Sequence, residues 1–205
     1  MHALQRTQRL SQMRMRRVVV KVHIARANGG IGIRAYGRHL EYIQRDGVDR
    51  GGEGGELYSR DGEISDVRSF VERSRDDRHQ FRIIVSPEDA HALSDMKAST
   101  RALMNQMERD LGTRLDWVAV DHHNTGHSHT HIVVRGKDAH GADLVIARNY
   151  LTKGLRARAE EGLTQELGPR RDVEIAQARY REVPQDRFTS LDRALAKRSI
   201  VGWSA

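Results

Sequence analysis

The chain has 205 residues and carries 35 Lys and Arg against 28 Asp and Glu, a formal net charge of +7. It has no cysteine, which excludes a disulfide scaffold, a Cys-ligated zinc site and thiol catalysis. No apolar run approaches the roughly 18 residues of a membrane span, and no apolar stretch follows the basic N-terminus, so we expect a soluble cytoplasmic protein. Most of the cations are arginines, whose guanidinium groups bind phosphate through two hydrogen bonds, and nucleic acid is therefore a natural partner.

The first half of the chain predicts a strand followed by two helices. Residues 1–16 are basic and lack a clear period, which is typical of a terminal arm. Ile33, Tyr36, Leu40 and Ile43 recur at spacings of three and four, the period of a helix, and the same stripe predicts a core position for Tyr36. The predicted elements are a strand over 17–24, a helix over 33–47, a glycine-rich loop over 49–62 and a helix over 65–75.

The second half predicts more strands and two longer helices. The predicted elements are strands over 80–86, 115–122, 129–135 and 144–147, a helix from Pro87 to about Leu111, a helix over 149–167 and short helices after 170. The short connection between 122 and 129 indicates a hairpin, which argues against an all-parallel sheet. We therefore predict an α+β fold with a mainly antiparallel central sheet and helices packed on it.

The most informative stretch is 121–131, Asp-His-His-Asn-Thr-Gly-His-Ser-His-Thr-His. Alternate residues of a strand face the same side, so His129 and His131 share a face as they lead into the apolar segment 132–134. If residues 115–122 and 129–135 pair so that His122 lies opposite His129, a third imidazole joins them. We therefore predict a divalent metal site with His122, His129 and His131 as ligands, suited to Mn, Zn, Co or Ni, or to Mg where phosphate supplies oxygens.

A metal site in a basic protein suggests phosphate chemistry, which needs a nucleophile. Without cysteine the choices are water, Ser, Thr or Tyr. Tyr42 lies about 200° around the predicted helix from Leu40, on the border of a polar stripe, where it can leave the core and face a ligand. Its position on the helix, taken alone, favours an amphipathic packing role for Tyr42.

These residues together resemble a known family. The stretch 40–47, LEYIQRDG, resembles the nucleophile motif of plasmid relaxases, and His122-x-Asn124 followed by His129-Thr130-His131 resembles their metal motif. The stretch 80–89, QFRIIVSPED, resembles the intermediate motif, and the three motifs occur in the family's order. The chain is thus similar to relaxases of the HUH endonuclease superfamily, in the VirD-type and P-type mobilisation branch.

The resemblance implies an HUH, palm-like catalytic domain over 17–168, between the arm at 1–16 and a charged helical extension at 169–205 that belongs to a longer protein. It implies that Tyr42 attacks a scissile phosphate at an origin of transfer, giving a 5′-phosphotyrosyl intermediate that is later religated. The implied cofactor is a divalent ion, Mn, Mg or Zn, held by His122, His129 and His131. The implied partners are single-stranded origin DNA and relaxosome accessory and coupling proteins, with no membrane, in the bacterial cytoplasm.

Further roles follow for residues around these motifs. Many relatives carry Asp where this chain has Asn124, so Asp121, Asn124 and His127 are candidates to support the metal site or to relay a proton. Ser86 is implied to lie near the DNA, and cations predicted to contact phosphates are Arg17, Arg38, Arg45, Lys153, Arg156 and Arg158. Two alternatives stay open: another HUH enzyme, such as a rolling-circle initiator or a transposase, and a non-catalytic DNA-binding module with a structural metal.

Overall fold

The computed structural model describes residues 13–27, 31–46, 55–64, 67–123 and 126–182. The chain divides into two compact units, residues 16–167 and the two terminal segments 1–15 and 168–205. In the terminal unit, helix α6 (Asp172–Glu182) begins beside Arg14, whose guanidinium lies 3.2 Å from the Asp172 carboxylate. No helix in the described part of the chain is both long and apolar enough to span a membrane.

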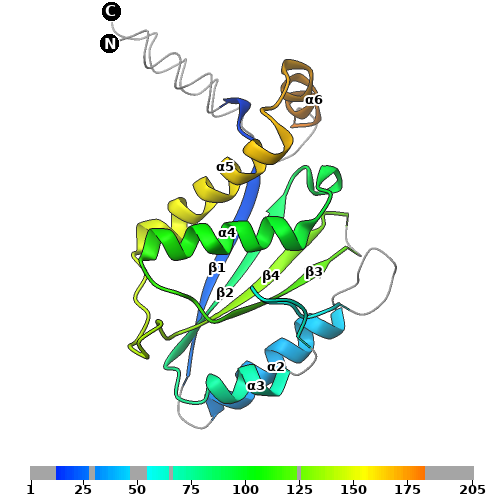
Figure 1. Cartoon of the computed structure of the whole chain (residues 1–205). Helices are drawn as coiled ribbons and strands as arrows, with labels where there is room; N and C mark the ends of the chain where they lie inside the picture. Colours follow the sequence, from blue (N-terminus) through cyan, green and yellow to red (C-terminus); the bar gives the residue numbers. More distant parts are fainter. Residues whose placement is uncertain (1–12, 28–30, 47–54, 65–66, 124–125, 183–205) are drawn as a thin grey trace, which may run out of the picture. The chain divides into compact units, whose positions relative to one another are not determined.

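The larger unit is built on a four-stranded antiparallel sheet in the order β1-β2-β4-β3 (Figure 1). Its strands are β1 (Val18–Arg26), β2 (His79–Pro87), β3 (Trp117–His122) and β4 (His129–Arg135). The sheet and its helices confirm the predicted α+β class. The β3–β4 hairpin and the β-branched segments of β1 and β2 form as their sequence patterns predict.

Helices α4 (Met96–Leu111) and α5 (Leu155–Leu167) lie across one face of the sheet (Figure 1). Their apolar side chains pack on Phe81, Ile83 and Val85 of β2 and on Trp117 and Ile132, forming the larger core. A π-helical turn, η2 (Tyr150–Gly154), leads directly into α5. These helices bury most of this face, although Ile24 of β1 stays 41% exposed.

The opposite face carries α2 (Ile31–Asp46) and α3 (Val67–Arg73). Leu40 and Ile43 of α2 pack with Phe70 of α3 on Val118, Val120 and Val133 of β3 and β4. Tyr36 is 2% exposed and its hydroxyl donates to the Ala25 carbonyl of β1 at 3.3 Å, so its predicted core position is confirmed. Because Tyr36 contacts β1 while Leu40 and Ile43 cover β3 and β4, α2 runs obliquely across the sheet.

Two sequence predictions are wrong. The helix expected from Pro87 begins only at Met96, because Pro87 ends β2 opposite Val18, and the side chain of Asp95 caps α4 by accepting from the Ala98 amide. A single 3-10 turn, η1 (Ala90–Ala92), lies between β2 and α4.

The strand expected over 144–147 does not form either. The Leu144 amide donates to the Gly136 carbonyl, and an isolated bridge joins Lys137 to Asp143. Leu144 and Ile146 still fill the core under α4 and α5. Their apolar character therefore reflects burial, without a sheet ladder.

Candidate metal centre and nucleophile

Three histidines share the face of the sheet that α2 and α3 partly cover. In the β3–β4 ladder His122 lies opposite His129, and Val120 lies opposite His131. This is the register that the sequence analysis assumed, and the structure confirms it. Val120 and Val133 lie on the same face and form an apolar base below the imidazoles, because side chains two residues apart face the same way.

The three rings are close enough to share one ion. Their centroids are 5.1 Å apart for His122 and His129, 4.5 Å for His122 and His131, and 5.0 Å for His129 and His131. One ligating nitrogen from each lies within 4.8 Å of the other two. Nitrogens that are each about 2.1 Å from a common ion are separated by about 3–4 Å, so small rotations of the rings bring them into range. The residues present therefore fit a divalent ion.

Two backbone carbonyls orient these rings. Nε2 of His122 lies 2.8 Å from the carbonyl oxygen of Ile43 in α2, and Nδ1 of His129 lies 3.0 Å from the carbonyl oxygen of His127. A carbonyl only accepts, so in each neutral ring the bonded nitrogen carries the proton and the other nitrogen carries the lone pair. Carbonyl bonds of this kind hold histidine ligands in the metal sites of many proteins.

The surroundings of His131 favour its neutral form. His122 is buried, while His129 and His131 are half-buried. Burial, together with the neighbouring His122 and His129, lowers the pKa of His131 to about 4. A neutral imidazole at physiological pH keeps its lone pair for a metal ion.

Tyr42 is the tyrosine that the structure leaves accessible on α2. Its side chain is 52% exposed, whereas Tyr36 and Tyr58 are buried and Tyr150 donates its hydroxyl to the Asp110 carboxylate. Tyr42 precedes Ile43, the residue whose carbonyl accepts from His122. The helix that presents Tyr42 is thus hydrogen-bonded to the histidine cluster at the next residue in the chain.

A groove runs along the outer side of α2. It is lined by Arg38, Tyr42 and Arg45 from the helix and by Leu57 and Glu63 from the segment 55–64. The Arg45 guanidinium lies 5.9 Å from the centre of the Tyr42 ring. Two of the arginines predicted to contact DNA therefore share a groove with the predicted nucleophile.

The other predicted site residues lie at different places. Ser86 is on the same face as the histidines, because it follows Ile84 by two residues and Ile84 pairs with His131. Asn124 lies outside the described residues. Arg17 faces Glu88, with 3.6 Å between guanidinium and carboxylate.

Asp121 lies on the opposite face of the sheet from the histidine rings. Its Oδ1 accepts from the Tyr58 hydroxyl at 2.8 Å and from the Thr130 hydroxyl at 2.6 Å. Burial and the Asp121 charge raise the pKa of Tyr58. Asp121 pairs with Thr130, which sits between His129 and His131, so this buried network joins β3 and β4 directly behind the cluster. Its position favours a structural contribution over a proton relay.

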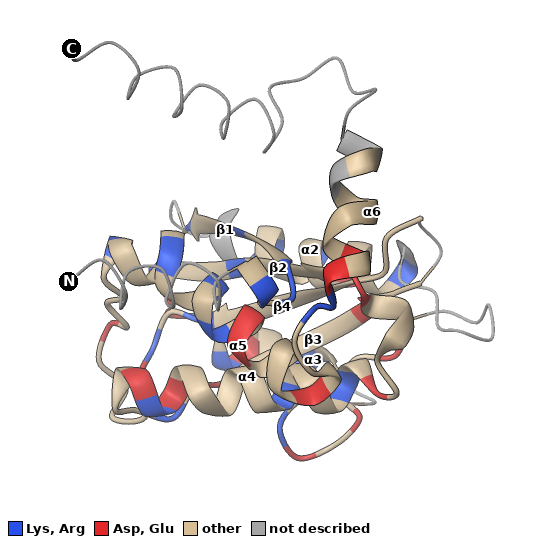
Figure 2. Ribbon diagram, turned by 90° about the horizontal axis from the view of Figure 1, so that it is seen from above, with Lys and Arg blue, Asp and Glu red and all other residues tan. Residues whose placement is uncertain are grey.

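The three cations of the later helix are separated from the histidines by the sheet. Lys153 and Arg156 are exposed on η2 and α5, and Arg158 is bound to Asp110 at 2.9 Å and to Glu161 at 3.0 Å. Figure 2 shows basic and acidic positions side by side on α4 and α5, which reduces the net positive charge of this face. DNA contact by these three residues stays a prediction.

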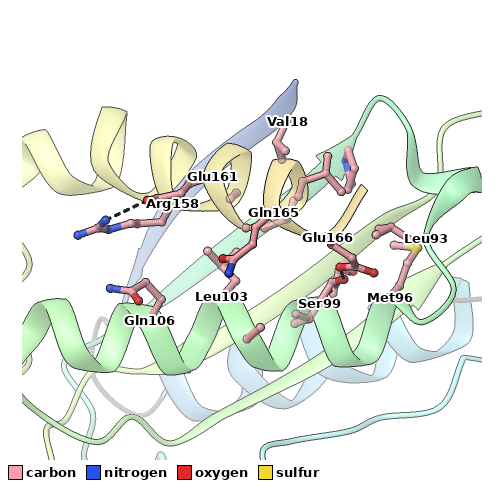
Figure 3. Close-up of a pocket in the computed structure, with 18 of the residues that line it drawn as sticks. Val18, Leu93, Met96, Ser99, Leu103, Gln106, Arg158, Glu161, Gln165 and Glu166 are labelled. Atoms are coloured by element: carbon pink, nitrogen blue, oxygen red, sulfur yellow. Dashed lines mark hydrogen bonds and ion pairs between the residues drawn. The ribbon is translucent and has the colours of Figure 1, made fainter. Parts of the chain in front are cut away.

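A cavity of about 250 Å³ lies between α4 and α5 on this same face. Figure 3 shows Ser99 and Leu103 of α4 facing Gln165 and Glu166 of α5 across it. Its floor is apolar, and Ser99 is bound to Glu166. None of the three clustered histidines lines this cavity, so we assign the chemistry to the other face.

Sequence reasoning missed the two carbonyls of Ile43 and His127. Every residue has a carbonyl, so no side-chain pattern identifies one that orients a ring. It also missed His39 and Arg82, which lie beside the cluster. Besides burial, the charges of Arg82 and His23 lower the pKa of His39, and the charge of His39 contributes to lowering the pKa of His131. The spacing of His23, His39 and Arg82 in the sequence has no recognisable pattern.

The comparison with known families agrees with this geometry. Residues 45–160, more than half of the chain, match the family described as Relaxase: MobA/VirD2-like, nuclease domain. The matched segment contains all three histidines of the cluster and begins three residues after Tyr42. No curated protein matches the chain significantly. The chain belongs to the MobA/VirD2-like relaxase family, whose members are DNA-nicking nucleases.

Proposed function

We propose that this chain nicks one DNA strand at an origin of transfer and rejoins it, with Tyr42 as the nucleophile. In this proposal His122, His129 and His131 hold a divalent ion. The observation that carries the proposal is the 2.8 Å hydrogen bond from His122 Nε2 to the Ile43 carbonyl, which ties the histidine cluster to the residue that follows Tyr42. The family match supports nuclease chemistry on DNA.

The reaction is a transesterification. The Tyr42 hydroxyl oxygen attacks the scissile phosphorus, its proton passes to water, and a tyrosine–phosphorus bond forms as the bond from phosphorus to the 3′ oxygen breaks. The 3′ oxygen takes a proton and leaves as a hydroxyl, so the products are a 5′-phosphotyrosyl strand and a free 3′ end. One phosphodiester replaces another, and attack by a 3′ hydroxyl therefore reseals the strand without a nucleotide cofactor.

The chain's own residues position the reacting groups. Burial of Leu40 and Ile43 fixes α2 on the sheet and with it the place of Tyr42. Arg38 and Arg45 line the same groove as Tyr42, and in this proposal they bind phosphates of the strand. A bound Mn, Mg or Zn ion would supply positive charge for the phosphate oxygens in the transition state.

We further propose that the chain works on a conjugative or mobilisable element in the bacterial cytoplasm. There it would meet its origin as a single strand near the nick, together with accessory and coupling proteins. This context follows from the family alone.

The test is incubation with single-stranded oligonucleotides that carry candidate origins, with Mn or Mg. We expect a covalent, protease-sensitive adduct on the 5′ end of the fragment that lies downstream of the nick. Tyr42→Phe and EDTA should each abolish the adduct. Tyr36→Phe and Tyr150→Phe serve as matched controls and should retain it.

The alternatives give different results in the same experiment. A non-catalytic module would bind the oligonucleotides without forming any adduct, and Tyr42→Phe would change nothing. A rolling-circle initiator or a transposase would form the adduct on the origin or end sequence of its own element and not on an origin of transfer.

A further inference from the structure

Among the described residues of the larger unit, no helix covers β1 and β2 on the sheet face beside the histidines. Because α2 runs obliquely, it covers β3 and β4 near the cluster but leaves β1 and β2 open there. On β1 the positions that face this side, Val19, Lys21 and His23, are all exposed, with Val19 at 48%. On β2 Ile84 and Ser86 of the same face are half-buried. These side chains form an open strip that leads away from the cluster.

The strip contains an arginine whose hydrogen bonds are incomplete. Arg82 of β2 is half-buried, and its Nε is buried without a hydrogen-bond partner. Its NH2 group lies 3.5 Å from the Ala35 carbonyl, at the limit of a hydrogen bond. No ion pair in the described part of the chain involves Arg82. The Nε atom is closed to solvent, so an anion would bind the guanidinium group from its exposed side and compensate the charge of this half-buried arginine.

Other basic groups surround this arginine. His23 of β1 is its partner in the β1–β2 ladder, and the charge of Arg82 acts on His39 of α2. Lys21 lies on the same face of β1, one step of the pleat closer to the cluster. In the described residues no acidic side chain is among the electrostatic influences on Arg82 or His39. The strip therefore carries the charges of Lys21 and Arg82, while His23 and His39 offer imidazole N–H groups that can donate to an anion.

The strip is continuous with the proposed active site. Arg82 pairs with Val133, two residues after His131, which places it about 7 Å along the strand from the cluster. His39 lies three residues before Tyr42, so both project from neighbouring positions on one flank of α2. A strand whose scissile phosphate lies at the histidines can thus continue over Lys21, His23 and Arg82.

We propose that Lys21, His23, His39 and Arg82 form a second DNA-binding site, which holds backbone phosphates next to the scissile one. The ligand is a single-stranded nucleic acid, because exposed Val19 and half-buried Ile84, which lie beside Lys21 on the same face, offer apolar contact to unpaired bases. This inference rests on the proposed nicking function for the identity of the strand. It assigns binding residues that the arginine-rich segments of the sequence did not suggest.

The first test measures binding of a labelled oligo(dT) single strand by fluorescence anisotropy as a function of salt. The logarithm of the association constant falls linearly with the logarithm of the salt concentration, and each lost phosphate contact should make this slope shallower by about 0.7. At 0.1 M salt this corresponds to about a fivefold loss of affinity. We expect this for Arg82→Gln and for Lys21→Gln. The matched control Arg109→Gln removes the same charge on α4, on the other face, and should bind as the unchanged protein does.

Arg82 is partly buried, so Arg82→Gln is accompanied by a thermal denaturation measurement. If it fails to fold, Lys21→Gln and His23→Gln decide the matter, because both positions are exposed on β1. Slopes and affinities equal to those of the Arg109→Gln control in folded variants would overturn the proposal.

The second test uses an oligonucleotide that the protein cleaves, with single phosphates replaced by neutral methylphosphonates. One replacement next to the scissile phosphate should weaken binding to the unchanged protein and add no further loss to Arg82→Gln. Fully additive losses at every position overturn the assignment. If no oligonucleotide is cleaved but the salt slopes change as expected, the nicking function fails while the binding site stands.

Discussion

Replacing Asp121 with asparagine separates two roles for this carboxylate. Next to His122 in the sequence it is a candidate proton relay, whereas in the structure it accepts hydrogen bonds from Tyr58 and Thr130 on the opposite face. Asparagine retains an acceptor oxygen but removes the charge, and it cannot take up a proton. A structural role therefore predicts lost stability with retained chemistry.

The magnitude follows from the two hydrogen bonds. Bonds to a charged acceptor contribute about 1.5–3 kcal/mol and neutral ones about 1 kcal/mol, so Asp121→Asn should cost about 2 kcal/mol of unfolding free energy. For a unit of this size that lowers the melting temperature by about 4–8 °C. Tyr58→Phe and Thr130→Val each remove one of the same bonds. The loss of stability caused by Tyr58→Phe or by Thr130→Val should therefore be smaller in a protein that already carries Asp121→Asn.

The assay pairs thermal denaturation with single-turnover adduct formation, measured well below the melting temperature. We expect the adduct to form within about threefold of the normal rate for all three variants, since proton transfer by a positioned group contributes a much larger factor of about 10² or more. A hundredfold slower reaction for Asp121→Asn at an unchanged melting temperature would refute the reasoning and restore the relay.

Three further predictions concern stability. Asp77→Ala should cost about 1–3 kcal/mol in urea denaturation, because it removes two hydrogen bonds from the guanidinium of Arg135, which keeps Asp116 as a partner at 3.2 Å. Burial, with Arg82 as the next cause, lowers the pKa of His39 to about 4, below its value of about 6.5 in the unfolded chain. The unfolded chain therefore binds more protons between those values, so the urea midpoint should fall as pH drops from 6.5 to 4 and fall less in His39→Gln. Gly136→Ala should cost about 1–3 kcal/mol in the same assay, since its Cβ would lie 2.2 Å from the backbone oxygen of His79.

Each of these has an outcome that contradicts it. An unchanged urea midpoint in Asp77→Ala would mean that the buried pair contributes nothing net. Equal pH dependence in the unchanged protein and His39→Gln would remove His39 from the account of acid sensitivity. Gly162→Ala is the control for the glycine variant, because its Cβ would meet no atom within 4 Å, and equal effects of the two would contradict the steric argument.

The fold class and the metal cluster were predictable because both are encoded in local pattern. The histidines at 129 and 131 lead into an apolar strand, and period-two alternation alone puts them on one face. A hairpin connection then brings His122 back to the same end of the sheet, which is why the predicted register holds. The start of α4 was mispredicted, because a proline can begin a helix or end a strand, and only the pairing of Pro87 with Val18 decides which.

The sequence by itself thus determined the residue types of the chemistry: three imidazoles, a phenol near the start of the chain and an excess of arginine. Only the tertiary structure decided which groups meet, since contacts between distant segments depend on how helices cross the sheet. The oblique path of α2 brings the Ile43 carbonyl to His122 and leaves Lys21 and Arg82 on open strands. The sheet separates Asp121 and the cations of α5 from the histidines. The crossing of a helix over a sheet joins segments that are tens of residues apart, and no local spacing records it.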